Sequence, residues 1–435
     1  MTLLNIPSAG VSHPLSWPPH APLTLARSRP GPDRFAIVCD RAGFDALEPE
    51  WNDLFERAGR DAQLFQTFNW NWHWANHYLP AGAGPAKLSL AIVTVHRQDR
   101  LMVLWPLVLE TGSGLRLLRW MGEPVSQYGD VLVGNVPDRQ VLLQRSWQFI
   151  ASRLGADAVH LRKVRADAAV LPLLSSIGMR QVAVAQAPYL DLASAPDFAH
   201  YERRYSHKAR KNRRRLMRRL EERGVIHTSR HTGSEEAGAA ARTAVALKRA
   251  WSKANGRIAP SLADARFAAF FADVTQARHR PAGCAVLSMT CNGGIASMAI
   301  DVTCGRRRAA HIIVHDPAFN HLSPGTLLLQ EWIRGASADG IATFDLLAPA
   351  YAYKADWADG SIAVNDYALG LTFAGRAYTV VYLSLLRSAL KAGLEAFTRR
   401  LGRLRAWRSP VAAAEPAPQG PQPASADTQL PLQRG

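Results

Sequence analysis

Two stretches of the chain repeat one order of predicted elements, and this order limits the folds that the chain can adopt. In each stretch helices precede a run of short apolar strands, which a further helix and strand follow. Apolar residues at helical or alternating spacing support the assignments, and two similar α/β lobes are the plain interpretation. In the first stretch we expect helices at 44–57, 69–78 and 139–154 and strands at 35–38, 88–95, 101–109, 131–133, 158–161 and 182–192. In the second we expect helices at 235–254, 262–277 and 326–338 and strands at 284–291, 295–303, 309–314 and 342–347.

A chain of 435 residues has room for two domains, each with its own core. The predicted fold class is α/β (α+β), with two lobes that are each a mixed, largely antiparallel sheet flanked by helices, joined by a long basic helix. We expect an N-terminal lobe at 34–195 and a C-terminal lobe at 196–375 that includes the basic helix 198–223. Outside them we expect a disordered Pro-rich leader (1–33), a cationic amphipathic helical extension (376–408) and a disordered tail (409–435).

The charge balance restricts the partners. Lys and Arg number 52 against 35 Asp and Glu, a formal net charge of +17 that attracts phosphorylated ligands, nucleic acid or an anionic membrane face. Neither a secretory signal nor an apolar run long enough to span a bilayer is visible. We therefore expect a cytoplasmic protein that can touch the inner face of the membrane through 376–408. The cysteines form no CxxC pair and no histidines cluster at metal-ligand spacing, so no metal is expected.

The segment 321–326, which follows the strands of the second stretch, is the strongest candidate for binding phosphate. Ser323 is a good N-cap, Pro324 suits the first helical position, and Gly325 lets a ligand approach the backbone. Thr326 lies in the first turn of the predicted helix, whose N-terminus presents unpaired N–H groups and the positive end of the dipole. A well-capped helix without a ligand is the alternative. We predict Ser323, Gly325 and Thr326 as donor-binding residues.

Several short motifs carry a family resemblance. They are Ile295-Ala296, Asp316-Pro317-Ala318-Phe319, Leu322-Ser323-Pro324-Gly325, Phe344-Asp345-Leu346-Leu347 and Tyr353-Lys354-Ala355-Asp356-Trp357, with weaker matches at Phe68-Asn69-Trp70 and 206–215. In order and spacing they resemble the acyltransferase domain of the CelD/BcsL family, in the FemAB-like branch of the GNAT acetyltransferase superfamily. The resemblance implies two GNAT-like lobes and transfer of an acyl group from acyl-coenzyme A. Because Ser-Pro-Gly replaces the Arg/Gln-x-x-Gly-x-Gly/Ala loop of GNAT enzymes, the site of the donor phosphates stays open.

Three residues in the last two motifs are the candidate catalytic groups. Asp345 ends a predicted strand, where ligands gather in α/β proteins, and can accept a proton from the acceptor. Tyr353 can protonate the leaving thiolate, and Lys354 can stabilise an oxyanion or bind phosphate. The alternatives are a turn-capping carboxylate for Asp345 and a solvated surface lysine for Lys354. The resemblance places a Tyr-Lys pair at these positions.

Three further residues are candidates for contact with the acceptor. His311 lies on a predicted strand next to the one that carries Asp301, and is either a base or a structural histidine. The segment Gln127-Tyr128-Gly129-Asp130 matches a Tyr-x-Asp element of the family. Tyr128 and Asp130 are expected to line an acceptor groove between the lobes, unless the segment is a plain turn.

The segment 198–223 is densely cationic and carries apolar residues at helical spacing. Ser206, Lys208, Arg210 and Lys211 match a Ser-x-Lys-x-Arg-Lys element of the family, which implies binding of an anionic small-molecule donor that is nucleotide-linked or phosphorylated. Binding of tRNA and a solvated helix that bridges the lobes are the alternatives.

The function predicted first is an N- or O-acyltransferase that moves an acyl group, acetyl in the first instance, from acyl-coenzyme A. Its acceptor would be an amine or hydroxyl of a sugar, a polysaccharide precursor or a cell-envelope component. The resemblance connects this activity with cellulose or exopolysaccharide biosynthesis. Two alternatives are an aminoacyl-tRNA-dependent peptidyl transferase of the FemAB type and a non-catalytic module that binds nucleic acid or a membrane.

Overall fold

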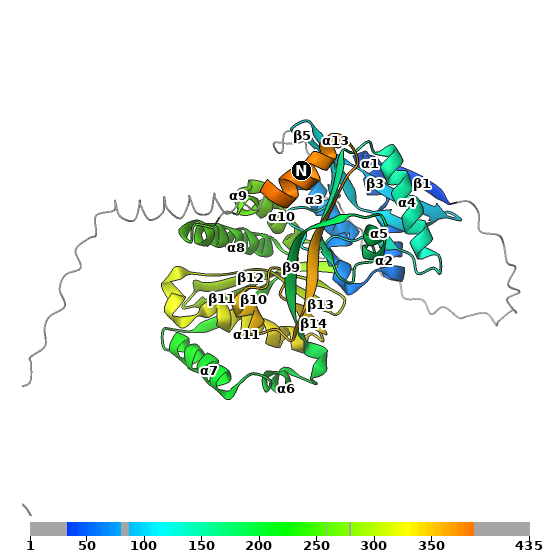
Figure 1. Ribbon diagram of the computed structural model, residues 1–435. Coiled ribbons are helices and arrows are strands. Elements are labelled where there is room, and N and C mark those ends of the chain that lie inside the picture. Colours follow the sequence, from blue (N-terminus) through cyan, green and yellow to red (C-terminus); the bar gives the residue numbers. More distant parts are fainter. Residues whose placement is uncertain (1–32, 80–86, 258, 278–279, 387–435) are drawn as a thin grey trace, which may run out of the picture.

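Figure 1 shows a mixed α/β protein in which helices flank extended sheets. The computed structural model describes residues 33–79, 87–257, 259–277 and 280–386. The predicted tail, the predicted leader up to residue 32 and residues 387–408 of the predicted extension lie outside the described residues. The predicted class, with largely antiparallel sheets flanked by helices, is confirmed.

The N-terminal part, up to residue 195, consists of short helices and strands in two sheets. The helix predicted at 44–57 is in fact two helices that meet at Leu47, and Pro49 lies in the first turn of the second, where its missing N–H has no role. The elements are β1 (Arg34–Val38), α1 (Arg41–Ala46), α2 (Glu48–Ala58), α3 (Phe68–Tyr78), β2 (Lys87–Leu90), β3 (Ile92–Arg97), β4 (Arg100–Trp105), β5 (Leu107–Gly112), β6 (Leu115–Trp120), β7 (Leu132–Val133), α4 (Arg139–Arg153), β8 (Ala158–Arg165), α5 (Leu171–Ser176) and β9 (Arg180–Asp191).

Two strands predicted as continuous are each divided between the sheets. The strand expected at 88–95 becomes β2 and β3, and the one at 101–109 becomes β4 and β5. β3 and β4 belong to a four-stranded sheet with β1 and β7, whereas β2 and β5 belong to an eleven-stranded sheet. Pro106 lies at the second break, where it has no N–H to donate to a ladder. The predicted hairpin is confirmed, since β3 and β4 pair around a turn at Gln98 and Asp99.

The C-terminal part follows the predicted order. The expected elements are α8 (Glu235–Ala254), α10 (Ala265–Gln276), β11 (Ala282–Cys291), β12 (Gly294–Cys304), β13 (Arg307–His315), α11 (Pro324–Ala338) and β14 (Thr343–Asp345). Asn292 and Gly293 connect β11 to β12 with positive φ, as the turn composition predicts. Elements that were not predicted here are β10 (Ile226–His231), α9 (Pro260–Ala263), α12 (Ala352–Ala355) and β15 (Gly360–Gly370).

The basic segment 198–223 forms two helices, and the prediction of one long basic helix is wrong. α6 (Phe198–Glu202) stops before the residues 203–206, and α7 (His207–Glu221) begins after Ser206. The hydroxyl of Ser206 accepts a hydrogen bond from the N–H of Ala209 at 3.1 Å, so Ser206 caps a new helix instead of continuing the first. α7 buries Leu216 and Leu220 and leaves most of its cationic side chains exposed.

The large sheet runs from one part of the chain into the other. Its strand order is β10-β11-β12-β13-β14-β9-β15-β8-β6-β5-β2. β15 lies between β9 and β8 and is antiparallel to both, so a strand from the C-terminal part completes the sheet of the N-terminal part. The two predicted lobes are therefore joined by strand pairing. Their predicted limits, 34–195 and 196–375, stay a prediction.

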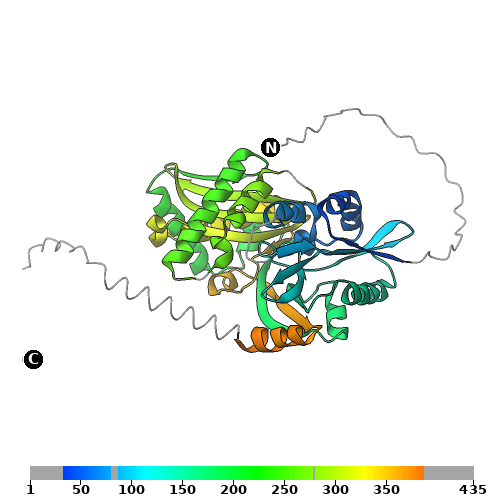
Figure 2. The ribbon, with the colours of Figure 1, turned by 90° about the horizontal axis from the view of Figure 1, so that it is seen from above.

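Helices cover both faces of the strands β11, β12 and β13. α8 and α10 lie on one face and α11 and α7 on the other (Figures 1 and 2). The hydrophobic core between α3, α8 and α10 joins the two parts of the chain, and the rings of Trp70 and Phe270 are 4.8 Å apart there. This shared core holds the two parts in one arrangement.

The first residues of the predicted cationic extension pack on the protein. α13 (Phe373–Ala377) and the π-helical segment Tyr378–Leu386 follow β15, and Thr379 and Leu383 are buried. In the part of the chain that the structure describes, no helix has the length and apolar content needed to cross a bilayer.

Candidate active site

β13 and β14 are parallel neighbours for only three residues, from Arg307 opposite Thr343 to Ala309 opposite Asp345. Two adjoining cavities of about 280 and 540 Å³ open where this pairing ends. Residues 310, 311 and 313 of β13 and residues 346–349 after β14 line the smaller one. We call the two cavities together the cleft. Both are lined by Lys248, Trp251, Arg257, Ile313, Leu329, Tyr351 and Tyr353.

The larger cavity lies at the N-terminus of α11. Ser323, Gly325 and Thr326, the predicted donor-binding residues, line it. The prediction that Ser323 caps the helix is wrong, because its φ is +50° and its side chain makes no capping hydrogen bond. A Cβ on Gly325 would lie 3.4 Å from Nδ1 of His315, so the backbone here is closely bordered on one side only. The uncapped first turn presents the positive end of the helix dipole to the cavity.

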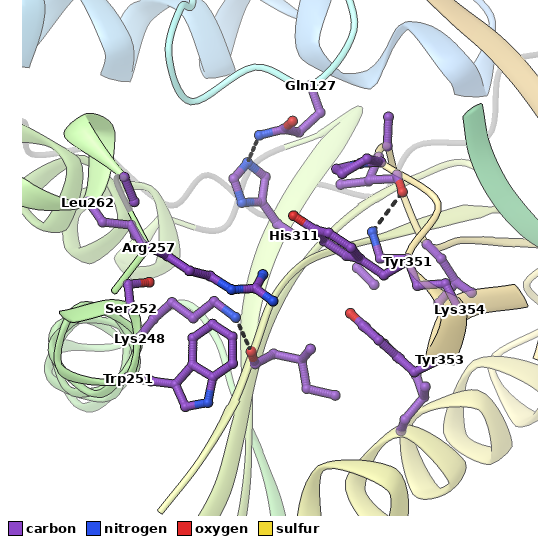
Figure 3. A pocket seen from close by; sticks show the side chains of 18 of the residues that line it. Gln127, Lys248, Trp251, Ser252, Arg257, Leu262, His311, Tyr351, Tyr353 and Lys354 are labelled. Carbon is purple, nitrogen blue, oxygen red and sulfur yellow. Dashed lines mark hydrogen bonds between the residues drawn. The ribbon is translucent and has the colours of Figure 1, made fainter. Parts of the chain in front are cut away.

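His311 projects from β13 into the smaller cavity (Figure 3). Its Nε2 lies 2.6 Å from the carbonyl oxygen of Val125, so Nε2 carries the proton and donates it. Nδ1 then holds a lone pair, and it is buried without a hydrogen-bond partner among the described residues. Burial lowers the pKa of His311 to about 4, so the ring is neutral near pH 7. A neutral imidazole with an unshared lone pair can accept a proton from a substrate.

Two lysines reach the cleft from opposite walls. Nζ of Lys248 on α8 donates to the carbonyl oxygen of Ile313 at 2.9 Å, and Nζ of Lys354 on α12 donates to that of Leu347 at 2.8 Å. Burial lowers the pKa of each lysine to about 8. Lys354 is only 8% exposed and is therefore not the solvated surface lysine of the alternative interpretation. Both amino groups are charged donors near pH 7.

Aromatic rings and one arginine form the mouth of the cleft. Tyr351 and Tyr353 stack with their ring centres 6.3 Å apart, and each is 44% exposed. The buried portion of Tyr353 raises its pKa to about 12, so its hydroxyl keeps its proton at neutral pH. The guanidinium of Arg257 lies 4.9 Å from the ring centre of Trp251 and 5.5 Å from that of Tyr351.

Asp345 does not line the cleft and is 1% exposed. Both of its oxygens have partners. Oδ1 accepts from the hydroxyl of Tyr128 at 2.7 Å and from the N–H of Leu347 at 2.9 Å. Oδ2 accepts from Arg165 at 3.3 Å and from Arg307 at 2.9 Å. The carboxylate joins the two parts of the chain, a geometry that does not favour the predicted role as a base.

Tyr128 and Asp130, the predicted acceptor-groove residues, are buried outside the cleft. Asp130 accepts from the N–H groups of Ala169 and Val170, each at 3.0 Å, and burial raises the pKa of both Tyr128 and Asp130. The residue of this segment that does line the cleft is Gln127, whose Nε2 is 3.3 Å from Nε2 of His311.

None of the four predicted anion-binding residues of the basic segment lines the cleft. Ser206 caps α7, and Lys208 and Lys211 are exposed on it. Arg210 is partly buried, with no hydrogen-bond partner for its Nε among the described residues. α7 nevertheless borders the larger cavity, because the guanidinium of Arg213 lies 4.7 Å from the ring of Trp357, which lines that cavity.

The predicted site omits six of the seven residues that line both cavities. Three of the six are Lys248, Trp251 and Arg257. They come from the end of α8 and the turn after it, far from β13 in sequence. Helical spacing predicts α8 but does not reveal what its last turn faces. The signal that was present is an aromatic residue among cations in the run Lys248-Arg249-Ala250-Trp251-Ser252-Lys253.

Part of the chain matches a known protein family. Residues 207–355, which contain β13, α11 and most of the cleft, match the family described as acetyltransferase (GNAT) domain. No curated protein matches the sequence. The crystal structure of FemX is similar in fold, with a TM-score of 0.51 and 11% identity over 77% of this chain and 98% of that one.

Two further solved structures have lower TM-scores. A conserved protein of unknown function from Bacteroides thetaiotaomicron has a TM-score of 0.49 and 10% identity, over 77% of this chain and 100% of that one. A tandem GNAT protein from the clavulanic acid biosynthesis pathway has a TM-score of 0.43 and 13% identity, over 78% and 99%.

The class of protein follows from these findings. The chain contains an acetyltransferase (GNAT) domain and is an acyltransferase, and the FemX likeness shows that the shared fold extends over both parts of the chain. The described residues contain no group of three or more His, Cys, Asp or Glu side chains that could hold a metal ion.

Proposed function

We propose that the protein transfers an acyl group from acyl-coenzyme A to an amine or hydroxyl acceptor bound in the cleft. The observation that carries this proposal is the continuity of the cleft from the N-terminus of α11 to His311. The helix N-terminus suits the phosphates of the donor, and the other end offers a proton acceptor. GNAT domains use acyl-coenzyme A as the donor, which agrees with the family match.

In the proposed reaction the acceptor nitrogen or oxygen attacks the thioester carbonyl, and its proton passes to Nδ1 of His311. The ammonium of Lys354 donates to the oxyanion that develops on the carbonyl. The carbon–sulfur bond then breaks, and the thiolate takes the phenolic proton of Tyr353. Solvent restores that proton and removes the one on His311. His311 takes the role predicted for Asp345, whose oxygens are all engaged.

The acceptor in this proposal is a sugar, a polysaccharide precursor or a cell-envelope component, as the resemblance to the CelD/BcsL family implies. The exposed rings of Tyr351 and Tyr353 support it, because aromatic faces at a cleft mouth can stack on the ring of a sugar. The resemblance also implies a place in cellulose or exopolysaccharide biosynthesis.

Coenzyme A binding tests the donor site. Coenzyme A should raise the melting temperature of the full chain, and Gly325→Glu should abolish this shift because a carboxylate would occupy the N-terminus of α11. Gly335→Glu is the matched control, since it adds the same charge on an exposed turn of the same helix with open space around it. Absence of a shift with coenzyme A and with every acyl-coenzyme A tried on the wild type would exclude the proposal.

A second candidate function is aminoacyl transfer from tRNA, and the exposed cationic side of α7 next to the cleft favours it. In that case tRNA should bind with an affinity that falls steeply with salt, because each neutralised phosphate releases counterions. The pair Lys208→Ala and Lys211→Ala should then reduce the salt slope by about 2. Affinity that does not change with salt would exclude this candidate.

A non-catalytic module is the remaining candidate. It predicts that His311→Ala and Lys354→Ala leave function in a complementation assay unchanged, whereas the acyltransferase requires both residues.

A further inference from the structure

The cleft is lined by cations without a single acidic side chain. Lys248, Arg257 and Lys354 line it, and none of the described lining residues is Asp or Glu. Both lysines donate to main-chain carbonyl oxygens instead of carboxylates. Three positive groups around one cavity repel each other unless an anion enters it.

Arg257 is the cation best placed to bind an anion directly. Its side chain is exposed at the mouth, yet the rings of Trp251 and Tyr351 lie within 4.9 and 5.5 Å of the guanidinium carbon. Contact with the rings occupies the faces of the guanidinium, and no described carboxylate takes its N–H groups. Figure 3 shows the group reaching from the α8 side toward the centre of the cleft. A guanidinium held in this way presents a planar fork of N–H groups, which matches the geometry of a carboxylate or a phosphate.

Arg257 lines both cavities, and its place in the smaller one allows it to bind an anion of the acceptor. The phosphates of the donor are proposed to lie at Ser323–Thr326, which line the larger cavity alone. Arg257 follows α8, in the connection to α9, and also lines the smaller cavity, together with His311 and Lys354. An anionic group held by Arg257 on the side of the smaller cavity would lie at the end of the cleft where the nucleophile reacts.

We propose that the acceptor carries an anionic group, a carboxylate or a phosphate, in addition to its nucleophilic amine or hydroxyl, and that Arg257 binds this group with support from Lys248. The inference rests on the proposed acyltransferase function of the same cleft. It narrows the acceptor class to acidic molecules, such as sugar phosphates or sugars that carry a carboxylate.

Lys248 gives this proposal a dependence on pH. Burial, and secondly the positive charge of Arg257, lower the pKa of Lys248 to about 8. The other charged or titratable groups that line the cleft are His311, Lys354, Tyr351, Tyr353 and, in the larger cavity, His315. The anion should bind more tightly as pH falls from 9 to 7, because Lys248 and Lys354, whose pKa values are both lowered to about 8, gain their charges in that interval. A neutral acceptor should not follow this trend.

Matched probes test the proposal on the full chain. Titration calorimetry would compare glucosamine, glucosamine 6-phosphate and muramic acid, each with and without saturating coenzyme A. These probes share an amino sugar and differ in carrying no anion, a phosphate or a carboxylate. We expect at least tenfold tighter binding of one anionic probe, and the stronger of the two identifies the anion. Equal affinity for all three, or no binding of either anionic probe, would overturn the inference.

Variants separate this inference from the proposed function. Arg257→Gln should weaken the anionic probe at least tenfold and leave coenzyme A binding within twofold, whereas Arg257→Lys should retain part of the affinity. Arg242→Gln is the control, because it removes the same charge from an exposed position of α8 outside the cleft. If Arg257→Gln weakens coenzyme A instead, the arginine belongs to the donor and the inference is wrong. If the wild type binds the anionic probe but not coenzyme A, the proposed donor fails and the anion site stands.

Discussion

Among the residues that the structure describes, two pairs of parallel strands diverge, one in each part of the chain, and only one of them opens into the cleft. β6 and β8 pair at Leu117 and Leu118, opposite Ala158 and Val159. β13 and β14 pair over a similarly short distance. In both cases the strands stop pairing after two or three residues, so the difference lies in what occupies the space beyond.

In the N-terminal part the chain that follows β6 fills this space. The segment 121–131, here called the plug, buries Met121, Val125, Tyr128 and Val131. It is fixed to β8, because the N–H of Gly129 donates to the carbonyl oxygen of Lys163 at 3.1 Å and Nζ of Lys163 donates to that of Ser126 at 2.9 Å.

The plug also serves the cleft of the C-terminal part. Val125 supplies the carbonyl that orients His311, and Gln127 contacts the same ring. The hydroxyl of Tyr128 fixes Asp345, the last residue of β14 that pairs with β13 before the two strands diverge. The comparison teaches that the same segment fills the space beyond one strand pair and forms part of the wall of the cleft beyond the other.

Substitution of His311 on β13 and of His160 on β8 should show the largest difference between the two strand pairs. His311→Ala should lower kcat by about 10²–10⁴-fold, because the proposed proton acceptor is lost. His160→Ala, on β8 beside the plug, should lower the melting temperature and leave kcat per folded molecule unchanged. Steady-state kinetics with thiol detection would measure both effects. Equal losses of kcat would contradict the view that only one divergence is catalytic.

Removing a hydrogen bond of the plug should have the second-largest effect, a loss of stability. Tyr128→Phe removes the hydroxyl that donates to buried Asp345, and we expect a loss of about 1–3 kcal/mol in the free energy of unfolding. The measurement is denaturant unfolding. Asp345 keeps Arg165, Arg307 and the N–H of Leu347, so the cleft should retain coenzyme A binding. A wild-type free energy of unfolding would show that the plug does not hold Asp345 in place.

The low pKa of His311 sets a pH range for both activity and stability. The folded value of about 4 lies below the ordinary 6.5, so the neutral base persists and kcat/KM should stay level down to about pH 5. Between pH 6.5 and 4 His311 binds a proton in the unfolded chain but not in the folded chain, so the free energy of unfolding falls as pH falls. His311→Gln should remove on the order of 1–3 kcal/mol of that fall in unfolding experiments. Parallel pH curves for both proteins would refute the shift.

The smallest expected effect is the difference in stability between removing the cap residue of α7 and removing that of α11. Ser206→Ala removes the hydroxyl that caps α7 and should lower the free energy of unfolding by about 1 kcal/mol. Ser323→Ala removes no capping bond from α11 and should change it by less than about 0.5 kcal/mol. Thermal unfolding of both variants makes the comparison, and a larger loss from Ser323→Ala would show that α11 is capped after all.

Local chemistry made much of the fold predictable. α8 was predicted at its observed limits, and the turns at Asn292-Gly293 and Gly340 follow from residues that accept positive φ. What local patterns could not show is partnership between distant segments. β15 lies between β8 and β9 because it pairs with strands that are far away in sequence, and no local pattern within residues 360–370 indicates that position.

The same limit applies to the candidate site. Residues placed there by local order were predicted, and those placed by contacts between distant segments were not. The predicted loop Ser323–Thr326, His311, Tyr353 and Lys354 line the cleft, because strand ends and a helix start in sequence order bring them there. Asp345 was selected for its place at a strand end and Tyr128 for its match to a family element, but burial and mutual hydrogen bonding occupy both. The anion-binding role of the basic segment stays a prediction. Arg257 was missed because its environment is made by rings from two distant segments.

The position of β15 makes the order of synthesis matter. β8 and β9 leave the ribosome early, but the strand that must lie between them is among the last described elements to be made. Until then both present open edges that invite wrong pairing. A chain that stops after residue 355 would contain the whole matched acetyltransferase domain and still lack the strand that closes its sheet. Only a chain translated through residue 370 can therefore bury those edges and complete the sheet.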